Sequence, residues 1–320
     1  MQEALIEKRL ALAGKLTMVF AKMSAAVALA AYAFAAATGQ AHAETLRWKL
    51  NPGEVLHYTM ESKEVVTFNV QGKDKKSIRT STANISWSVN SVSANGDAEI
   101  TFRFDRFRLR VDESPLVPLE FDSSPNNKQI PDEFEGLDRQ IKAMAGAEFT
   151  FKLRPNGAVE DLKIAEKTLK SFQNAAPQGA GGQGAGSEQA LKEVLLQSSP
   201  PPFPAESVEP GKNWAAKPAK MPVPGLGTLT AEKVFTFEGP DSKTPALLQI
   251  GVESKLSLEP DENVTAKIRK QEGTGTLTFD AEHGRIVNTR NKQRVEIVAS
   301  QRGQEMVQST DTTATMTLDP

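Results

Sequence analysis

Long runs of alternating apolar and polar residues dominate this sequence. From Leu56 to Val70 every apolar side chain except Val65 falls on an even position, and polar residues occupy most of the positions between them. This period of two is typical of a β-strand with one buried face. Similar stretches recur in residues 85–89, 234–237, 248–258, 274–279, 285–298 and 306–318. The pattern predicts a mainly β fold, in which a long antiparallel meander forms a curved sheet or a half-open barrel, with two or three short helices.

The stretch TFRFDRFRLRV, residues 101–111, shifts the phase of this alternation. Its apolar residues are even up to Phe104 and odd from Phe107 onward. One extra residue in a strand produces such a shift, so a β-bulge is predicted at Asp105-Arg106. The four arginines of the stretch then face away from its aromatic residues. They suit a solvated outer face paired with acids, or a nucleic-acid-binding strip, and the acidic chain favours the outer face without a nucleic-acid partner.

The first 43 residues have the features of an export signal. Residues 23–37 form an Ala-rich, uncharged run after basic residues, and Ala41-His42-Ala43 is a small-x-small cleavage site. The apolar run is shorter than the roughly 20 residues that span a bilayer, which favours cleavage over a membrane anchor. Met18 and Met23 are alternative starts. We therefore expect a signal peptide over residues 1–43 and no stable membrane span after cleavage.

Charge and cysteine content narrow the class of protein further. Residues 1–43 hold four of the 38 basic and two of the 40 acidic residues, so the remaining chain has 34 basic and 38 acidic residues and a net charge of −4. That balance gives no general attraction for phosphate or anionic lipid. The absence of cysteine excludes disulfides, thiolate metal sites, cysteine nucleophiles and the acylated cysteine of a lipoprotein. We expect a periplasmic or secreted protein.

The exported part divides into two β-rich halves, residues 44–176 and 201–320. Residues 177–200 between them comprise a Gly-rich linker and a short helix. Helical spacing predicts short helices over residues 132–145, 165–174 and 188–197. Short similarities between the halves, each a strand followed by a hairpin turn, suggest a weak internal repeat. The two halves either complete one curved sheet or form two packed domains.

Three short motifs carry a resemblance to a known family. They are L-K-S-F at residues 169–172 after an Asn-Gly hairpin, Phe203-Pro204, and V-x-P-G-x-x-W at residues 208–214. This layout resembles an uncharacterised family of bacterial secreted β-rich proteins, a domain of unknown function, and that resemblance implies no activity and no site residues. The meander with its inserted helices is also similar in outline to the periplasmic lipoprotein-carrier fold, a half-open barrel with a lid.

The inventory of reactive side chains is small. His57 falls on the polar face of a strand and His283 in a turn, without the further ligands that zinc needs. Asp261, Glu262 and Asn263 lack the calcium-loop pattern, and there is no G-x-S-x-G nucleophile motif. A hydrolase with paired carboxylates is the only enzymatic alternative, and no pair stands out. The prediction is a protein that is not an enzyme and has no metal or cofactor.

The long strands suggest a binding function instead. In a curved sheet their apolar faces form a concave wall. The predicted wall contains Leu56, Tyr58, Met60, Phe102, Phe104 and Phe107, although the same residues also suit a plain core. We expect an exported binding protein that carries an apolar or amphipathic, lipid-like ligand at the cell envelope. The alternative is a structural or protein-interaction module whose partner is an envelope protein and which has no small ligand.

Overall fold

A computed structural model describes residues 43–70, 73–113, 117–124, 130–175, 187–197, 202–223, 226–262, 264–301 and 304–320. The predicted signal peptide, apart from Ala43, lies outside these residues, and so does the Gly-rich part of the predicted linker up to residue 186. Within the described part of the chain, no helix is long and apolar enough to cross a membrane.

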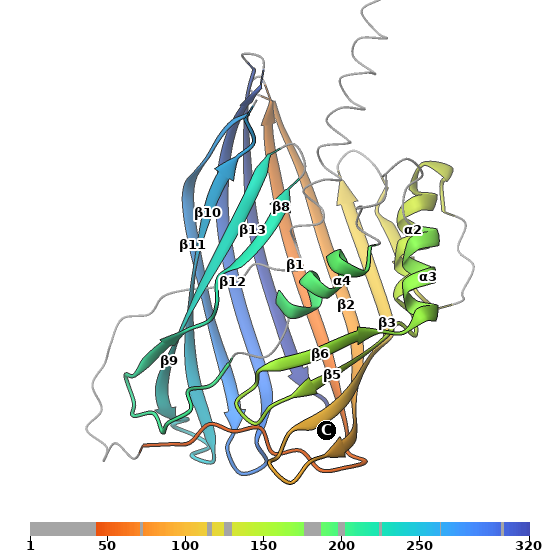
Figure 1. The fold of residues 1–320 in the computed structure, drawn as a ribbon. Coiled ribbons are helices and arrows are strands. Elements are labelled where there is room, and N and C mark those ends of the chain that lie inside the picture. The colour runs from red at the N-terminus through yellow and green to blue at the C-terminus, as the bar shows by residue number, and fades with distance from the viewer. Residues whose placement is uncertain are drawn as a thin grey trace, which may run out of the picture.

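Thirteen strands of the described chain form one antiparallel sheet (Figure 1). They are β1 (Val55–Val70), β2 (Lys73–Val92), β3 (Ala98–Glu113), β4 (Leu119–Asp122), β5 (Glu148–Leu153), β6 (Val159–Ile164), β7 (Asn213–Ala215), β8 (Ala219–Val223), β9 (Gly227–Pro240), β10 (Leu247–Pro260), β11 (Thr265–Asp280), β12 (Arg285–Gln301) and β13 (Gln304–Leu318). Their order is β6-β5-β3-β2-β1-β13-β12-β11-β10-β9-β7, with β4 beside β3 and β8 beside β9. The sheet is open, and the predicted fold class is confirmed.

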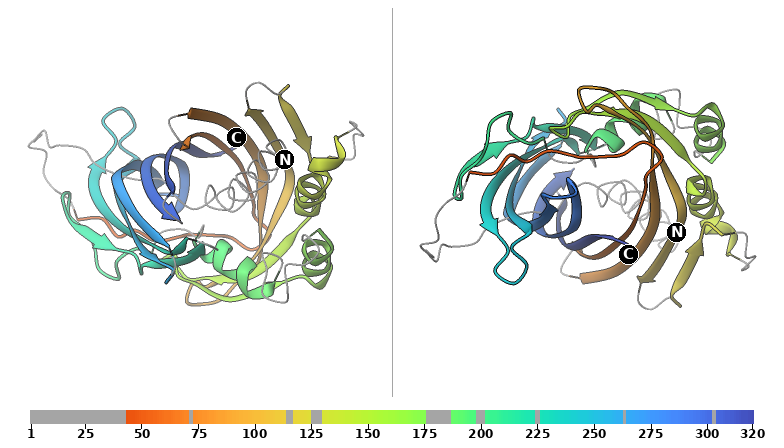
Figure 2. Two further views of the ribbon diagram at one scale, coloured as in Figure 1. Left: turned by 90° about the horizontal axis from the view of Figure 1, so that it is seen from above. Right: turned by 90° about the horizontal axis from the view of Figure 1, so that it is seen from below.

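The length of the strands explains the curvature of the sheet. The longest, β2, has 20 residues and therefore extends about 66 Å at 3.3 Å per residue. Right-handed twist accumulates over strands of this length and over many neighbours, so a large sheet cannot stay flat. Viewed along the strands, the sheet bends into a deep trough whose two edges approach each other (Figure 2).

The helices lie at the margins of the sheet. A 3₁₀ turn (Asp132–Phe134) leads into α2 (Glu135–Met144), and the other helices are α3 (Glu166–Ala175) and α4 (Glu188–Gln197), in agreement with the three predicted helices. The α2 and α3 helices pack on each other beside β3 and β4. The α4 helix contacts β6 and lies on the open side of the trough, between the two edges of the sheet (Figures 1 and 2).

Both sequence halves contribute to this one sheet. The first strand, β1, pairs with the last, β13, over thirteen residue pairs from Tyr58↔Leu318 to Val70↔Met306. The larger buried cluster also combines residues of both halves, for example Trp87 and Phe279. Of the two arrangements that the sequence left open, the structure has the single curved sheet. The boundaries assigned to the halves remain a prediction.

The predicted β-bulge lies in β3 at the predicted place. Asn84 of β2 is opposite Arg106, whereas the next residue, Ile85, is opposite Phe104, so Asp105 is the extra residue. Because the bulge absorbs one position, Phe104 and Phe107 stay on the same face of the sheet.

The arginines of β3 lie on the outer face, and Arg103, Arg106 and Arg110 are paired with acids. Arg106 donates two hydrogen bonds to Asp122 of β4, at 3.1 and 2.5 Å. Arg110 contacts Glu120 on the same neighbouring strand at 3.1 Å. The guanidinium of Arg106 holds the pKa of the Asp122 carboxyl below its usual range. This is the solvated, charge-paired face that the sequence predicted.

Two apolar clusters fill the inner face. The larger lies at the lower end of Figure 1, where its members include Trp48, Trp87, Ile250 and Phe279. The smaller lies at the upper ends of β8 to β12 and includes Leu229. Between the two clusters the inner face carries polar side chains.

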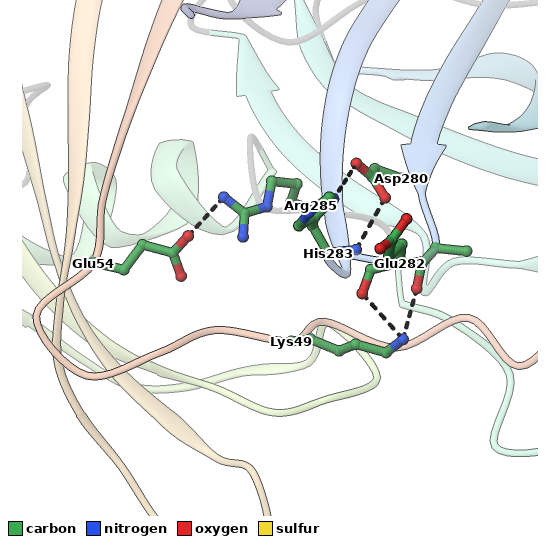
Figure 3. A network of polar contacts seen from close by, with 7 residues as sticks. Lys49, Glu54, Asp280, Glu282, His283 and Arg285 are labelled. Atoms are coloured by element: carbon green, nitrogen blue, oxygen red, sulfur yellow. Dashed lines mark hydrogen bonds and ion pairs between the residues drawn. The ribbon is translucent and has the colours of Figure 1, made fainter. Parts of the chain in front are cut away.

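The N-terminal segment, residues 43–54, crosses the lower end of the trough (Figure 3). Its Lys49 donates from the backbone to Gly284 at 3.0 Å and from Nζ to the Ala281 carbonyl at 2.6 Å. Glu54 forms an ion pair with Arg285 at 2.6 Å, and both side chains are only 17% exposed. The same segment inserts Leu46 and Trp48 into the larger cluster, so this end of the sheet is closed by packed side chains.

Candidate functional site

The register places the predicted wall residues in three rows on one face of the sheet. Each row has one residue of β2 between one of β1 and one of β3: Leu56-Trp87-Phe102, Tyr58-Ile85-Phe104 and Met60-Ala83-Phe107. This face is the concave one. Trp48 stacks on Trp87 of β2 at 5.6 Å between ring centroids and meets Phe279 of β11 at 6.2 Å, although three strands separate β2 from β11.

The six wall residues differ in how accessible they are. Leu56 and Tyr58 are 4% and 1% exposed and belong to the larger cluster. The Tyr58 hydroxyl donates to the Ile286 carbonyl oxygen at 3.1 Å, and burial raises the pKa of this hydroxyl. Met60 is 36% exposed. The three phenylalanines are half-buried and pack against the cluster, so the accessible part of the wall lies on its upper and β3 sides.

A polar row crosses the inner face above this wall. Arg79, Glu64, Thr312, Gln293 and Gly273 are consecutive partners on β2, β1, β13, β12 and β11. Side chains opposite each other in register point to the same side of a sheet. The row therefore faces the same way as the apolar wall, in the middle of the trough.

Burial is deep along this row. Glu64 is 3% exposed, Gln293 4% and Thr312 6%. An oxygen of the Glu64 carboxylate lies 3.5 Å from Arg79 Nη1, so the two charges on this side of the row compensate each other. Removing such charges from water is costly unless they are paired, which explains why the two residues occupy adjacent positions.

Several buried polar atoms on this face have no hydrogen-bond partner in the described structure. They include both amide atoms of Gln293, the Ser77 hydroxyl one row higher on β2, and the Oε1 atom of Gln308 on β13. An unsatisfied buried polar group costs about 1–3 kcal/mol. Native proteins contain few of them, and such atoms are usually satisfied by ordered water or by a further bound polar group.

Lys233 extends the row to β9. The β10–β11 pairing ends at Glu253 and Thr274, and the next residues of the two strands, Ser254 and Gly273, continue at the same level. Ser254 is in turn the register partner of Lys233. The polar row therefore runs from β2 to β9, with its two smallest side chains, at Ser254 and Gly273, between Gln293 and Lys233.

The environment of Lys233 is apolar. Its neighbours in the same phase of β9 are Ala231 of the smaller cluster and Phe235 of the larger one. The side chain is half-buried, and its ammonium group has no ion pair or side-chain hydrogen bond with any described residue. Burial lowers the pKa of Lys233, because loss of water disfavours the charged form.

The sequence contained a signal for these residues. Lys233 interrupts the apolar series Leu229, Ala231, Phe235, Phe237, and Glu64 and Gln293 each precede apolar residues of their own phase, Val66 and Val295. A polar residue in such a phase marks an interruption of the buried face. That these interruptions meet in one row depends on the pairing of seven strands, which the sequence pattern does not contain.

Of the two histidines, His283 has a structural side-chain partner. His283 Nδ1 lies 2.7 Å from the Asp280 carboxylate in the turn between β11 and β12 (Figure 3). Burial raises the pKa of Asp280, but hydrogen bonds from the backbone and ring of His283 outweigh it and hold the pKa below its usual range. His57 is exposed, and its backbone carbonyl accepts a hydrogen bond from the backbone N–H of Asp319 at 2.8 Å. No cluster of three potential metal ligands occurs among the described residues.

Away from the polar row, a hollow of about 470 Å³ lies on the polar face of β5 near the β2–β3 turn. Its lining includes Lys152 and Asp161, which form an ion pair at 3.0 Å. Asp161 has a left-handed backbone, with φ of 52°, at the irregularity where the β5–β6 register shifts. The hollow is open and these two charges are matched, so the polar row remains the better candidate.

Neither protein-family models nor curated protein sequences match the chain. Similar solved structures include lipovitellin, with a TM-score of 0.43, 11% identity and coverage of 84% of this chain and 25% of that one. A DUF1329 family protein from Desulfovibrio piger has a TM-score of 0.13. An outer membrane lipoprotein-sorting protein domain from Vibrio parahaemolyticus has a TM-score of 0.14. Each of the two shares 9% identity with this chain, and each match covers 79% of this chain and 83% of the other chain. This chain spans about a quarter of the lipovitellin chain. These low scores assign neither a family nor a function.

Proposed function

We propose that this chain is an exported, non-enzymatic binding protein that carries an amphipathic ligand against the inner face of its curved sheet. The observation that carries the proposal is the polar row. It places deeply buried hydrogen-bonding atoms without partners, at Gln293, between two apolar surfaces. A ligand with both a polar group and an apolar chain complements such a face, whereas a purely apolar ligand leaves the polar atoms unsatisfied.

The apolar part of the ligand has a surface on which to lie. Met60 is 36% exposed, and Phe104 and Phe107 are half-buried beside it. Each buried methylene group contributes about 0.8 kcal/mol. A chain of several methylenes along this surface therefore supplies most of the affinity, while the polar row fixes its orientation. The position of α4 on the open side of the trough suits a cover over the bound ligand (Figure 2).

The periplasmic or secreted location is part of this proposal and is supported by the N-terminal sequence, with its Ala-rich run and Ala41-His42-Ala43. The absence of an enzymatic role is part of the same proposal, and it is supported by the turn contact that holds the His283 ring against Asp280. An envelope carrier needs an exchangeable ligand rather than a reactive centre.

Native mass spectrometry of the exported full-length chain, purified without detergent, tests this function. We expect a non-covalent adduct of lipid-like mass that organic solvent removes and that lipid extract restores. Met60→Asp and Phe107→Asp introduce a charge on the accessible wall and are expected to abolish the adduct. His57→Asp, on the exposed outer phase of β1, is the matched control and should retain it. A chain without an adduct, unchanged by lipid extract, contradicts the carrier function and favours a protein-interaction module.

A further inference from the structure

The charges of the described side chains on the inner face do not balance. Among the side chains that the structure describes on the strands from β2 to β9, the charged residues in the inner phase are Lys75, Arg79, Glu64 and Lys233. Lys75 pairs with Glu113 of β3, and Arg79 pairs with Glu64. Lys233 is the remaining charge, and its ammonium has no partner among the described residues. The described inner face therefore carries one uncompensated positive charge in an apolar setting.

An uncompensated cation in such a setting is a site for an anion. Burial of an ammonium group without a counter-ion is unfavourable, and a bound anion removes that penalty. From this charge balance, and resting on the proposed carrier function, we infer that the ligand has an anionic headgroup and that Lys233 binds it.

Gln293 is suited to bind the same headgroup. Its Nε2 atom is a donor without a partner, and its side chain is 4% exposed. Three strand intervals separate its backbone from that of Lys233, at least about 14 Å at 4.8 Å per interval. Both long side chains project from the concave face, which brings their ends closer than their backbones, and only the small side chains of Ser254 and Gly273 stand at the positions between them.

The chemistry selects a class of headgroup. The Glu64 carboxylate, buried on the other side of Gln293, is already balanced by Arg79, so it provides no site for a cationic headgroup. An anionic oxygen accepts hydrogen bonds from both the Lys233 ammonium and the Gln293 amide. A carboxylate of a fatty acid and a phosphate of a phospholipid share this chemistry.

Titration calorimetry with matched probes tests the inference. Oleate, lysophosphatidate with an oleoyl chain, and the neutral oleyl alcohol are titrated into the full-length protein after solvent delipidation. We expect the two anionic probes to bind at least tenfold more tightly than the alcohol, because a charge-assisted hydrogen bond contributes about 1.5–3 kcal/mol. The tighter of the two anions identifies the carboxylate or the phosphate as the natural source.

Variants locate the charge effect. Lys233→Met should lose the preference for anions and keep the affinity for oleyl alcohol, whereas Lys233→Arg should keep the preference. Gln293→Leu should weaken binding of both anions without affecting that of the alcohol. Lys255→Met, on the exposed face of β10, removes a lysine that faces away from the trough and should change nothing. Circular dichroism and thermal unfolding establish that each variant is folded.

The possible results separate this inference from the proposed function. If oleate and oleyl alcohol bind equally, and Lys233→Met binds both as the original chain does, the headgroup inference is wrong while the carrier function stands. If no probe binds to the original chain, the carrier function itself fails. If inorganic phosphate alone binds as tightly as lysophosphatidate, the site takes a small anion and the amphipathic ligand is excluded.

Discussion

The lower end and the middle of the inner face are built on the same strands but differ in what they bury. At the lower end, Ile250 and Phe279 are completely buried, and the polar atoms are few: the Tyr58 hydroxyl has a partner, whereas the indole N–H groups of Trp48 and Trp87 have none in the described structure. In the middle, Gln293 is nearly as deeply buried, and neither of its two amide atoms has a partner in the described structure. The first region buries mainly apolar surface, whereas the second buries a whole amide group and a carboxylate, which is more costly.

This difference indicates that the two parts of each strand have separate roles, the lower end in stability and the middle in binding. A closed apolar end contributes the free energy that keeps a large open sheet folded, because buried apolar area is its main stabilising contribution. That stability permits the middle of the face to retain unsatisfied polar groups. Proteins commonly accept such local costs at binding sites.

The largest change in stability is expected from a substitution at the lower end. Phe279→Ala removes a ring that contacts Trp48 and Phe203 and is 0% exposed, so we expect the free energy of unfolding to fall by about 3–5 kcal/mol. Phe68→Ala, at a half-buried position near the upper end of β1, is the control and should cost about 1 kcal/mol. Urea denaturation measures both. Equal losses of unfolding free energy in the two variants contradict these separate roles.

A smaller change, a gain in stability, is expected from a substitution in the polar row. Gln293→Leu replaces an unsatisfied buried amide by an apolar group of similar volume, so the ligand-free protein should become more stable by about 1–2 kcal/mol. Thr289→Leu, on the same strand and face but lower, lacks this gain and serves as the comparison. A loss of stability in Gln293→Leu means that its amide is satisfied in solution and weakens the argument for a ligand there.

The smallest change in stability is expected from a substitution on the outer face. Because hydrogen bonds from Arg106 lower the pKa of Asp122 in the folded state, this carboxylate stabilises the protein above its unfolded pKa of about 3.9, and the contribution is lost as pH falls through the lower, folded value. The pair is partly exposed, so we expect less than about 1 kcal/mol. Asp122→Asn should reduce stability at pH 7 and have no effect near pH 2. A difference that persists at pH 2 rules out the ion pair as its cause.

Much of the fold was predictable because its determinants are local. Alternation in residues 56–70 defines β1, the phase shift at Asp105 places the bulge, and helical spacing gives α4 at residues 188–197. The candidate site was predictable only in part. The phase of Leu56 and Tyr58 indicated a shared apolar face, but their burial in the closed core, in contrast to the exposed Met60, depends on the N-terminal segment that packs over them.

What the sequence by itself determined is therefore the mainly β class, the face on which each side chain lies, and the outer position of the arginines, since each follows from neighbours a few residues apart. The tertiary structure decided which residues meet. It paired β1 with β13 and brought Glu64, Gln293 and Lys233 into one row from positions as far apart as 64 and 293. Strand order and register result from burying all strands of one curved sheet together, and this cooperative property cannot be read from the alternation within any one strand.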